Sequence, residues 1–157
     1  MNSMVRIAVA ADHNGYELKQ RLVTELRASG HQVTDLGSDG ADVADDYPDF
    51  AQRVCEAIRG GLADRAVVVC GSGVGVTVAA NKFPGIRAGM CHDLYSARQG
   101  VEHDDMNVLC LGSFVVAFDL ARDLVNEFLS AKFSNEERHA RRLSKVKALE
   151  ARFMKPE

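Results

Sequence analysis

The chain has 157 residues, of which 46% are hydrophobic and 26% charged, which suits one globular domain with one substantial core. Its formal net charge of −3 argues against a general nucleic-acid-binding protein. It shows no apolar run of membrane-spanning length, no N-terminal signal segment, and no metal-ligand spacing among its four cysteines. We therefore expect a cytoplasmic protein, residues 1–157 forming a single domain, with free thiols and no metal.

Short apolar or β-branched runs alternate with segments of helical periodicity along the chain. Strands are predicted at residues 5–11, 31–36, 66–70, 86–91 and 107–111. A leucine repeat ending at Gly30 predicts the first helix, and a stripe from Pro48 to Gly60 the second. Further helices are predicted at 74–82, 94–102 and 115–129. This order favours an α/β, three-layer Rossmann-like fold: a five-stranded parallel sheet with helices on both faces.

The C-terminal segment predicts one more helix, over about residues 134–153. Ser134-Asn-Glu-Glu137 is typical of a capping box that opens a helix. Arg138, Arg142 and Lys145 fall on one face, which is either solvated or holds an anion. We expect this helix to pack on its own chain or on a partner subunit.

Polar residues gather where the predicted strands end. Asp12 and His13 follow the first strand, Cys70 ends the third, and His92 follows the fourth. The helix before the last strand ends near His103. Because ligands of parallel sheets bind at the carboxyl ends of the strands, we expect these groups to meet at one edge as a single site.

The loop after Cys70 indicates how that site works. Gly71, Gly73 and Gly75 leave backbone N–H groups unobstructed, and the loop leads directly into a helix. Exposed amides at a helix N-terminus attract an anion. The same field is expected to stabilise a thiolate at Cys70, which makes it a usable base. A rival interpretation is dinucleotide binding, with Asp93 as the ribose-binding acid, but Val76 replaces the third glycine of GxGxxG.

These segments resemble a known family, the type B ribose-5-phosphate isomerases and the related galactose-6-phosphate isomerase subunits. The resemblance spans nearly the whole chain in one consistent order. It is carried by residues 11–19, 46–51, 69–75, 79–82, 84–88, 95–98, 102–103, 107–109 and 138–142.

The resemblance implies a homodimer, possibly a tetramer, with active sites at the subunit interface, a phosphorylated sugar as substrate and no cofactor. Cys70 is then the base that takes the proton from C2, and Ser72 moves protons between O1 and O2. His103 assists ring opening. The remaining implied roles are oxyanion binding by the amides of Gly71, Gly73, Val74 and Gly75, hydroxyl binding by Asp12 and Tyr47, substrate contact by Asp104, and phosphate binding by His13, Arg138 and Arg142.

Four positions refine this assignment. One branch of the family carries Ser at the Cys70 position and a carboxylate at the Val74 position, so this chain resembles the cysteine branch. Phe114 stands where the family usually has Arg, and Asp104 where it usually has Asn. The leading hypothesis is isomerisation of ribose 5-phosphate and ribulose 5-phosphate. The alternatives are the same chemistry on a tetrose or tetrulose 4-phosphate or on allose or galactose 6-phosphate, a non-catalytic sugar-phosphate-binding partner subunit, and a nucleotide-binding protein.

Overall fold

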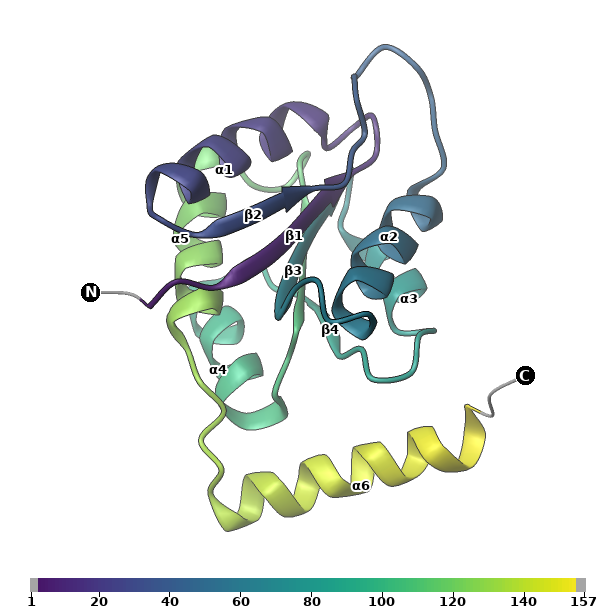
Figure 1. The fold of residues 1–157 in the computed structure, drawn as a ribbon, viewed down its shortest axis with the longest axis vertical. Coiled ribbons are helices and arrows are strands. Elements are labelled where there is room, and N and C mark those ends of the chain that lie inside the picture. The colour runs from purple at the N-terminus through teal and green to yellow at the C-terminus, as the bar shows by residue number, and fades with distance from the viewer. Residues whose placement is uncertain (1–2, 155–157) are drawn as a thin grey trace.

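The computed structural model describes residues 3–154 and contains the predicted parallel sheet of five strands (Figure 1). Each strand falls at its predicted segment, with bounds that differ by at most two residues. The order across the sheet is β2-β1-β3-β5-β4, so the last strand in sequence lies between the third and the fourth. The strands are β1 (Arg6–Ala11), β2 (Gln32–Asp35), β3 (Arg65–Cys70), β4 (Ala88–Met90) and β5 (Val108–Gly112).

Helices cover both faces of the sheet and create two separate apolar cores (Figure 1). One face carries three helices and the other face two, and a sixth helix lies outside these layers. The first face is covered by α1 (Tyr16–Ala28), α4 (Leu94–Asp104) and α5 (Phe118–Ser130), the second by α2 (Tyr47–Arg59) and α3 (Val74–Ala80), and the sixth helix is α6 (Glu137–Phe153). The predicted three-layer fold is therefore confirmed.

Strand alternation decides which layer each side chain of the site enters. Successive side chains of a strand point to opposite faces. Val69 belongs to the core beneath α1, α4 and α5, whereas Cys70 points toward α2 and α3. Ala11 pairs with Val69, and Cys70 pairs with Gly112. The loops that follow β1, β3 and β5 therefore start side by side.

The boundaries of three helices differ from the prediction. α3 has only seven residues, and α5 begins at Phe118 rather than at residue 115. The predicted capping box at Ser134 is wrong, because Glu136 occupies the N-cap of α6 and makes no side-chain cap. The Ser134 hydroxyl instead accepts a hydrogen bond from the backbone N–H of Glu136 at 3.2 Å and lies 2.5 Å from Nδ1 of His139.

α6 crosses the molecule at the amino ends of the strands, opposite the edge where Cys70 lies (Figure 1). It contacts the body through α4 and through Glu150, whose carboxylate accepts a hydrogen bond from Gly85 N at 3.0 Å. Leu143 is buried, while Val146, Leu149 and Phe153 are exposed. Much of the apolar face of this helix is therefore uncovered in a single chain. None of the helices in residues 3–154 is long and apolar enough to cross a membrane.

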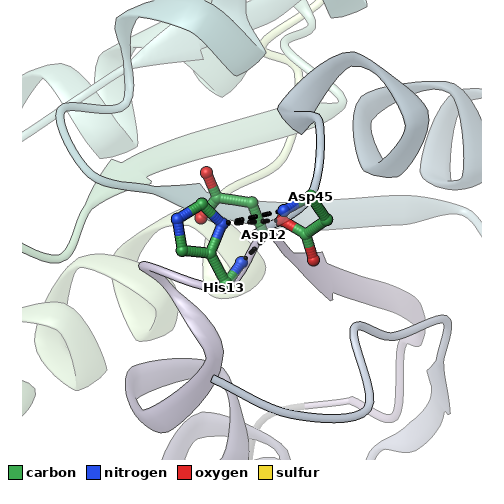
Figure 2. Close-up of side chains that lie close together, drawn as sticks. All are labelled: Asp12, His13 and Asp45. Atoms are coloured by element: carbon green, nitrogen blue, oxygen red, sulfur yellow. Dashed lines mark hydrogen bonds and ion pairs between the residues drawn. The ribbon is translucent and has the colours of Figure 1, made fainter. Parts of the chain in front are cut away.

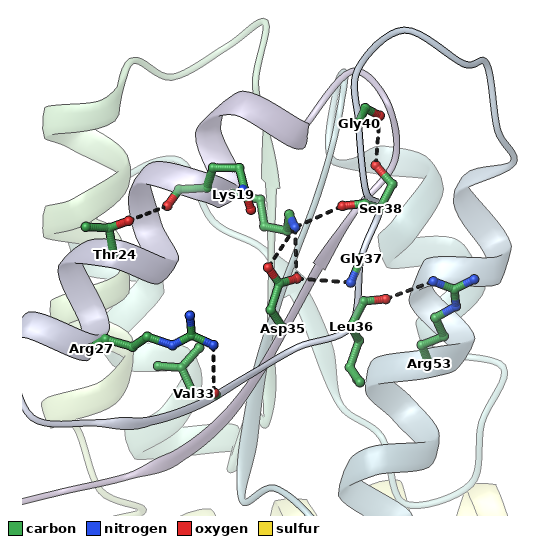
Figure 3. Close-up of polar contacts among 11 residues, drawn as sticks. Lys19, Thr24, Arg27, Val33, Asp35, Leu36, Gly37, Ser38, Gly40 and Arg53 are labelled. Carbon is green, nitrogen blue, oxygen red and sulfur yellow. Dashed lines mark hydrogen bonds and ion pairs between the residues drawn. The ribbon is translucent and has the colours of Figure 1, made fainter.

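A buried ammonium group organises the loop between β2 and α2 (Figure 3). Lys19 is 1% exposed, and its Nζ donates to both carboxylate oxygens of Asp35, at 2.8 and 3.0 Å, and to the Ser38 carbonyl at 3.0 Å. Arg53 donates to the Leu36 carbonyl from the other side, at 2.9 Å. The start of this loop is thus held at two points, and its far end carries Asp45 and leads into Tyr47.

Candidate active site

The loop after β3 places the Cys70 sulfur next to backbone donors. Sγ accepts a hydrogen bond from Gly73 N at 3.2 Å, and Gly73 has a positive φ of 83°. Ser72 is exposed, and its Oγ accepts from Val74 N at 3.1 Å. Because α3 has only seven residues, the field at this loop comes mainly from its own amides rather than from a long helix dipole. Cys70 itself is 4% exposed at the very end of its strand.

Two aromatic rings lie directly against the glycines of this loop. A Cβ on Gly75 would lie 2.8 Å from the Tyr47 ring, and one on Gly71 would lie 2.8 Å from the Phe114 ring. These glycines therefore allow close approach of the rings to the loop. Tyr47 borders the site from α2 and is 42% exposed, whereas Phe114 borders it from the loop after β5 and is 76% exposed.

Asp12 lies beside Cys70, at the end of the neighbouring strand. Its backbone N–H donates to the Val69 carbonyl at 3.2 Å, and its Oδ1 accepts from Gly15 N at 3.0 Å. Burial raises the pKa of the Asp12 carboxyl above its ordinary value, while hydrogen bonds from the backbone of Gly15 and Asn14 partly oppose that rise. A buried carboxylate at a loop of free amides can accept hydrogen bonds from the hydroxyls of a bound sugar.

His13 follows Asp12 and pairs with Asp45 of the loop that precedes α2 (Figure 2). His13 Nδ1 lies 2.8 Å from Asp45 Oδ1. The ligand atoms of Asp12, His13 and Asp45 all lie within 4.8 Å of one another, so these are the side chains in residues 3–154 that offer a metal ion a cluster of donors. The His13–Asp45 distance is that of a hydrogen bond, so each atom already has a partner.

Two other predicted strand-end residues have structural roles. His92 Nε2 accepts a hydrogen bond from Gly112 N at 3.0 Å, and burial lowers the pKa of its imidazole, which favours the neutral ring that this contact needs. Asp93 is the N-cap of α4, and its carboxylate accepts from Ser96 N at 2.7 Å. That bond lowers the pKa of Asp93. The carboxylate is therefore engaged in capping, which argues against its use as the ribose-binding acid of a dinucleotide site.

His103 lies at the other end of the sheet, so the prediction that all these groups share one edge of one chain is wrong. A crossover helix runs antiparallel to the strands it connects, so the last residues of α4 lie at the amino ends of the strands. The carbonyl of Asn107, four residues later, accepts a hydrogen bond from Ala66 N, near the start of β3, at 3.0 Å. His103 precedes β5 in the chain and so lies near the amino end of that strand, not near its carboxyl end.

A second cluster surrounds His103. Its ring stacks on that of His139 of α6, with centroids 3.9 Å apart, and its Nδ1 lies 3.0 Å from Gln99 Nε2. His139 is 2% exposed and was not predicted as a site residue, since a lone histidine on a charged helix gives no signal in sequence. Burial, followed by the charge of His103, lowers the pKa of His139. Asp104 is exposed beside this pair.

Arg138 and Arg142 of α6 lie close enough to this second cluster for their charges to help lower the pKa of His139. Arg138 pairs with Glu136 at 3.1 Å, while Arg142 has no ion-pair partner among residues 3–154. Arg141 pairs with Glu137 at 2.9 Å. In a single chain, therefore, the structure brings Cys70, Ser72, Asp12, His13 and Tyr47 together but holds His103, Asp104, Arg138 and Arg142 at the opposite end.

The sequence also matches known proteins along almost its whole length. A model of the family described as Ribose/Galactose Isomerase matches residues 7–146. This chain belongs to the ribose/galactose isomerase family. Its members are sugar-phosphate aldose–ketose isomerases, so the chain is an aldose–ketose isomerase, as the resemblance implies.

Individual relatives of this isomerase are similar over the same extent. It is 41% identical over 149 residues to ribose-5-phosphate isomerase B of Escherichia coli, covering 95% of this chain and 99% of that protein. It is 38% identical over 148 residues to D-erythrulose-4-phosphate isomerase 2 of Mycolicibacterium smegmatis, covering 93% and 97%. The solved structure of Clostridium thermocellum ribose-5-phosphate isomerase B superposes with a TM-score of 0.90 at 44% identity, covering 94% of this chain and 98% of that one.

Proposed function

We propose that this isomerase interconverts ribose 5-phosphate and ribulose 5-phosphate through an enediolate, without a metal ion, in the reducing cytoplasm. The observation that carries the proposal is the Cys70 sulfur at the carboxyl edge of the sheet, 3.2 Å from Gly73 N, with the buried Asp12 at the end of the neighbouring strand. The names of the E. coli and C. thermocellum relatives support this substrate. All four cysteines are free, which suits a reducing compartment.

The chemistry follows from the loop. The Cys70 thiolate removes the proton from C2 of the open-chain aldose, and the electrons of that C–H bond form the C1–C2 double bond of the enediolate. The negative charge that develops on oxygen is stabilised by the amides of the loop from Gly71 to Gly75. The Ser72 hydroxyl relays the proton between O1 and O2, and Cys70 returns its proton to C1. Atoms and charges balance without a cofactor.

The second cluster completes the site from another subunit in this proposal. Substrate at Cys70 needs a group that opens the sugar ring and a cation that holds the phosphate. His103, Arg138 and Arg142 are suited to these roles, because imidazole transfers protons and guanidinium binds phosphate in a bidentate manner. They lie beyond reach of Cys70 in their own chain. A two-fold dimer brings the Cys70 loop of one subunit to the His103 cluster of its partner.

Exposed apolar side chains around the Cys70 edge support such a dimer. Contiguous exposed apolar surface in a small protein marks an interaction site. The exposed side chains near this edge come from α3, from β4 and the start of α4, and from the loop after β5. They are Val74, Val78, Met90, Leu94, Phe114 and Val115, each at least 42% exposed. In this arrangement the C-terminal helix packs on both its own chain and the partner.

The test is a substrate panel assayed with purified protein and with Cys70→Ala. We expect ribose 5-phosphate to turn over at the highest kcat/KM among tetrose, pentose and hexose phosphates, with solvent deuterium entering C1 of the ribulose 5-phosphate product and with activity unchanged by a chelator. Cys70→Ala should lower kcat by about 10²–10⁴-fold, the contribution of a positioned base, and leave the fold unchanged. Preference for a tetrose or hexose phosphate refutes the substrate, and full activity of Cys70→Ala refutes the mechanism.

A further inference from the structure

His13 and Asp45 are tied together by three contacts across 32 residues of sequence (Figure 2). Asp45 Oδ1 lies 2.8 Å from the ring Nδ1 of His13, and the same oxygen accepts from His13 N at 2.9 Å. The backbone N–H of Asp45 lies 3.3 Å from Nδ1. Both side chains are only partly exposed, at 28% and 23%. One carboxylate thus fixes both the backbone and the ring of one histidine.

These contacts assign the proton on the imidazole. An ionised carboxylate only accepts hydrogen bonds, so at 2.8 Å Nδ1 must carry a proton. The backbone N–H of Asp45, 3.3 Å from the same nitrogen, is then not hydrogen-bonded to it, because two donors cannot bond to each other, and the shorter contact with the carboxylate decides the assignment. Nε2 is left as the ring nitrogen that faces a ligand, either as an acceptor or, in the imidazolium form, as a second donor. This is the arrangement by which a carboxylate partner fixes the tautomer and direction of a functional imidazole.

We propose that Asp45 is a positioning residue for substrate binding: it holds His13 as the Nδ1–H form with Nε2 directed to the phosphate end of the sugar. The inference rests on the proposed function, in which His13 binds that phosphate. Asp45 contacts no substrate atom itself. Its reach depends on the loop between β2 and α2, whose start is held by Lys19 through Asp35 and the Ser38 carbonyl.

This role separates Asp45 from the other acidic residues of its loop. Asp42 lies three residues earlier and is exposed, with no side-chain hydrogen bond or ion pair within residues 3–154. Asp42→Asn and Asp45→Asn remove the same charge from the same loop. They form a matched pair that separates loss of a nearby negative charge from loss of the His13 contact.

The first measurement is the ¹⁵N spectrum of the His13 ring, assigned by its loss in His13→Ala. Protein labelled at histidine should show a protonated Nδ1 in the natural chain and in Asp42→Asn. Asp45→Ala should move the spectrum toward the Nε2–H tautomer, and Asp45→Asn should retain part of the Nδ1–H signal, since an amide oxygen still accepts. An unchanged His13 spectrum in Asp45→Ala overturns the proposal, whether or not the protein isomerises any sugar.

The second measurement is a double-mutant cycle in steady-state kinetics. Asp45→Ala should raise KM for the phosphosugar by about tenfold, the low end of the effect of removing the partner of a ligating imidazole, while kcat stays close to the natural value. In a His13→Ala background the same change should add almost nothing. A rise in KM that persists undiminished in that background shows that Asp45 acts without His13 and overturns the proposal. Absence of isomerase activity refutes the proposed function instead and leaves the spectrum decisive.

Discussion

At the level of one side chain, the ionised carboxyl of Asp12 lowers the stability of the fold at neutral pH, yet the same carboxyl is proposed to bind hydroxyls of the substrate. Asp12 is 5% exposed, and burial raises the pKa of its carboxyl above the ordinary value of 3.8. Between the ordinary and the raised value the native state binds more protons than the unfolded chain. The stabilising contribution of this carboxyl is therefore complete below the ordinary pKa and is lost as the pH rises through the raised one. At neutral pH the ionised form is a cost to the fold.

We expect Asp12→Asn to increase stability at neutral pH and to abolish most activity. The amide keeps an oxygen for Gly15 N and removes the buried charge, so the free energy of unfolding should rise by about 1 kcal/mol. The gain should shrink as the pH falls through the raised pKa of Asp12, because the carboxyl of the natural chain then becomes protonated and neutral. Urea unfolding of the natural chain and of Asp12→Asn, from neutral pH down to the ordinary carboxyl pKa, measures this difference in unfolding free energy. A gain that does not change with pH would contradict an origin in the Asp12 charge.

At the level of elements, the loop between β2 and α2 depends on the buried ammonium of Lys19. Lys19→Met keeps the aliphatic stem but leaves Asp35 and the Ser38 carbonyl without their donor. Breaking a buried pair by removing one partner is expected to cost about 3 kcal/mol of unfolding free energy. Lys132→Met, at an exposed position, is the control and should stay within about 0.5 kcal/mol. An equal loss of unfolding free energy in both variants would show that the buried contacts of Lys19 do not stabilise the fold.

The sequence predicts the elements of this fold well because each has a local cause. The run from Ala66 to Cys70 is apolar throughout and lies in the middle of the sheet, as expected for a strand covered on both faces. The order of the strands is not local, since the connection from β3 to β4 leaves between them the position that β5 later fills. For the same reason sequence could not reveal the contact between His13 and Asp45, which depends on the path of a loop.

At the level of the whole molecule, the chain carries two incomplete sets of site residues. The set around Cys70 has the proposed base, backbone amides and a carboxylate, and the set around His103 has imidazoles and arginines. The two sets lie at opposite ends of the strands, so the length of the strands separates them. The sequence predicts both sets but cannot separate them, because the resemblance to the family orders residues along the chain and says nothing about which copy supplies each one.

If each site is shared between two subunits, two inactive variants should restore one another. Cys70→Ala and Arg142→Ala, co-expressed with different affinity tags and purified through both, give a heterodimer. One of its sites carries both defects and the other carries neither, so we expect about half of the natural activity. Each homodimer alone should be impaired, Cys70→Ala in kcat and Arg142→Ala in KM. A doubly tagged dimer no more active than the two homodimers would show that Cys70 and Arg142 act within one chain, which the positions of β3 and α6 in Figure 1 oppose.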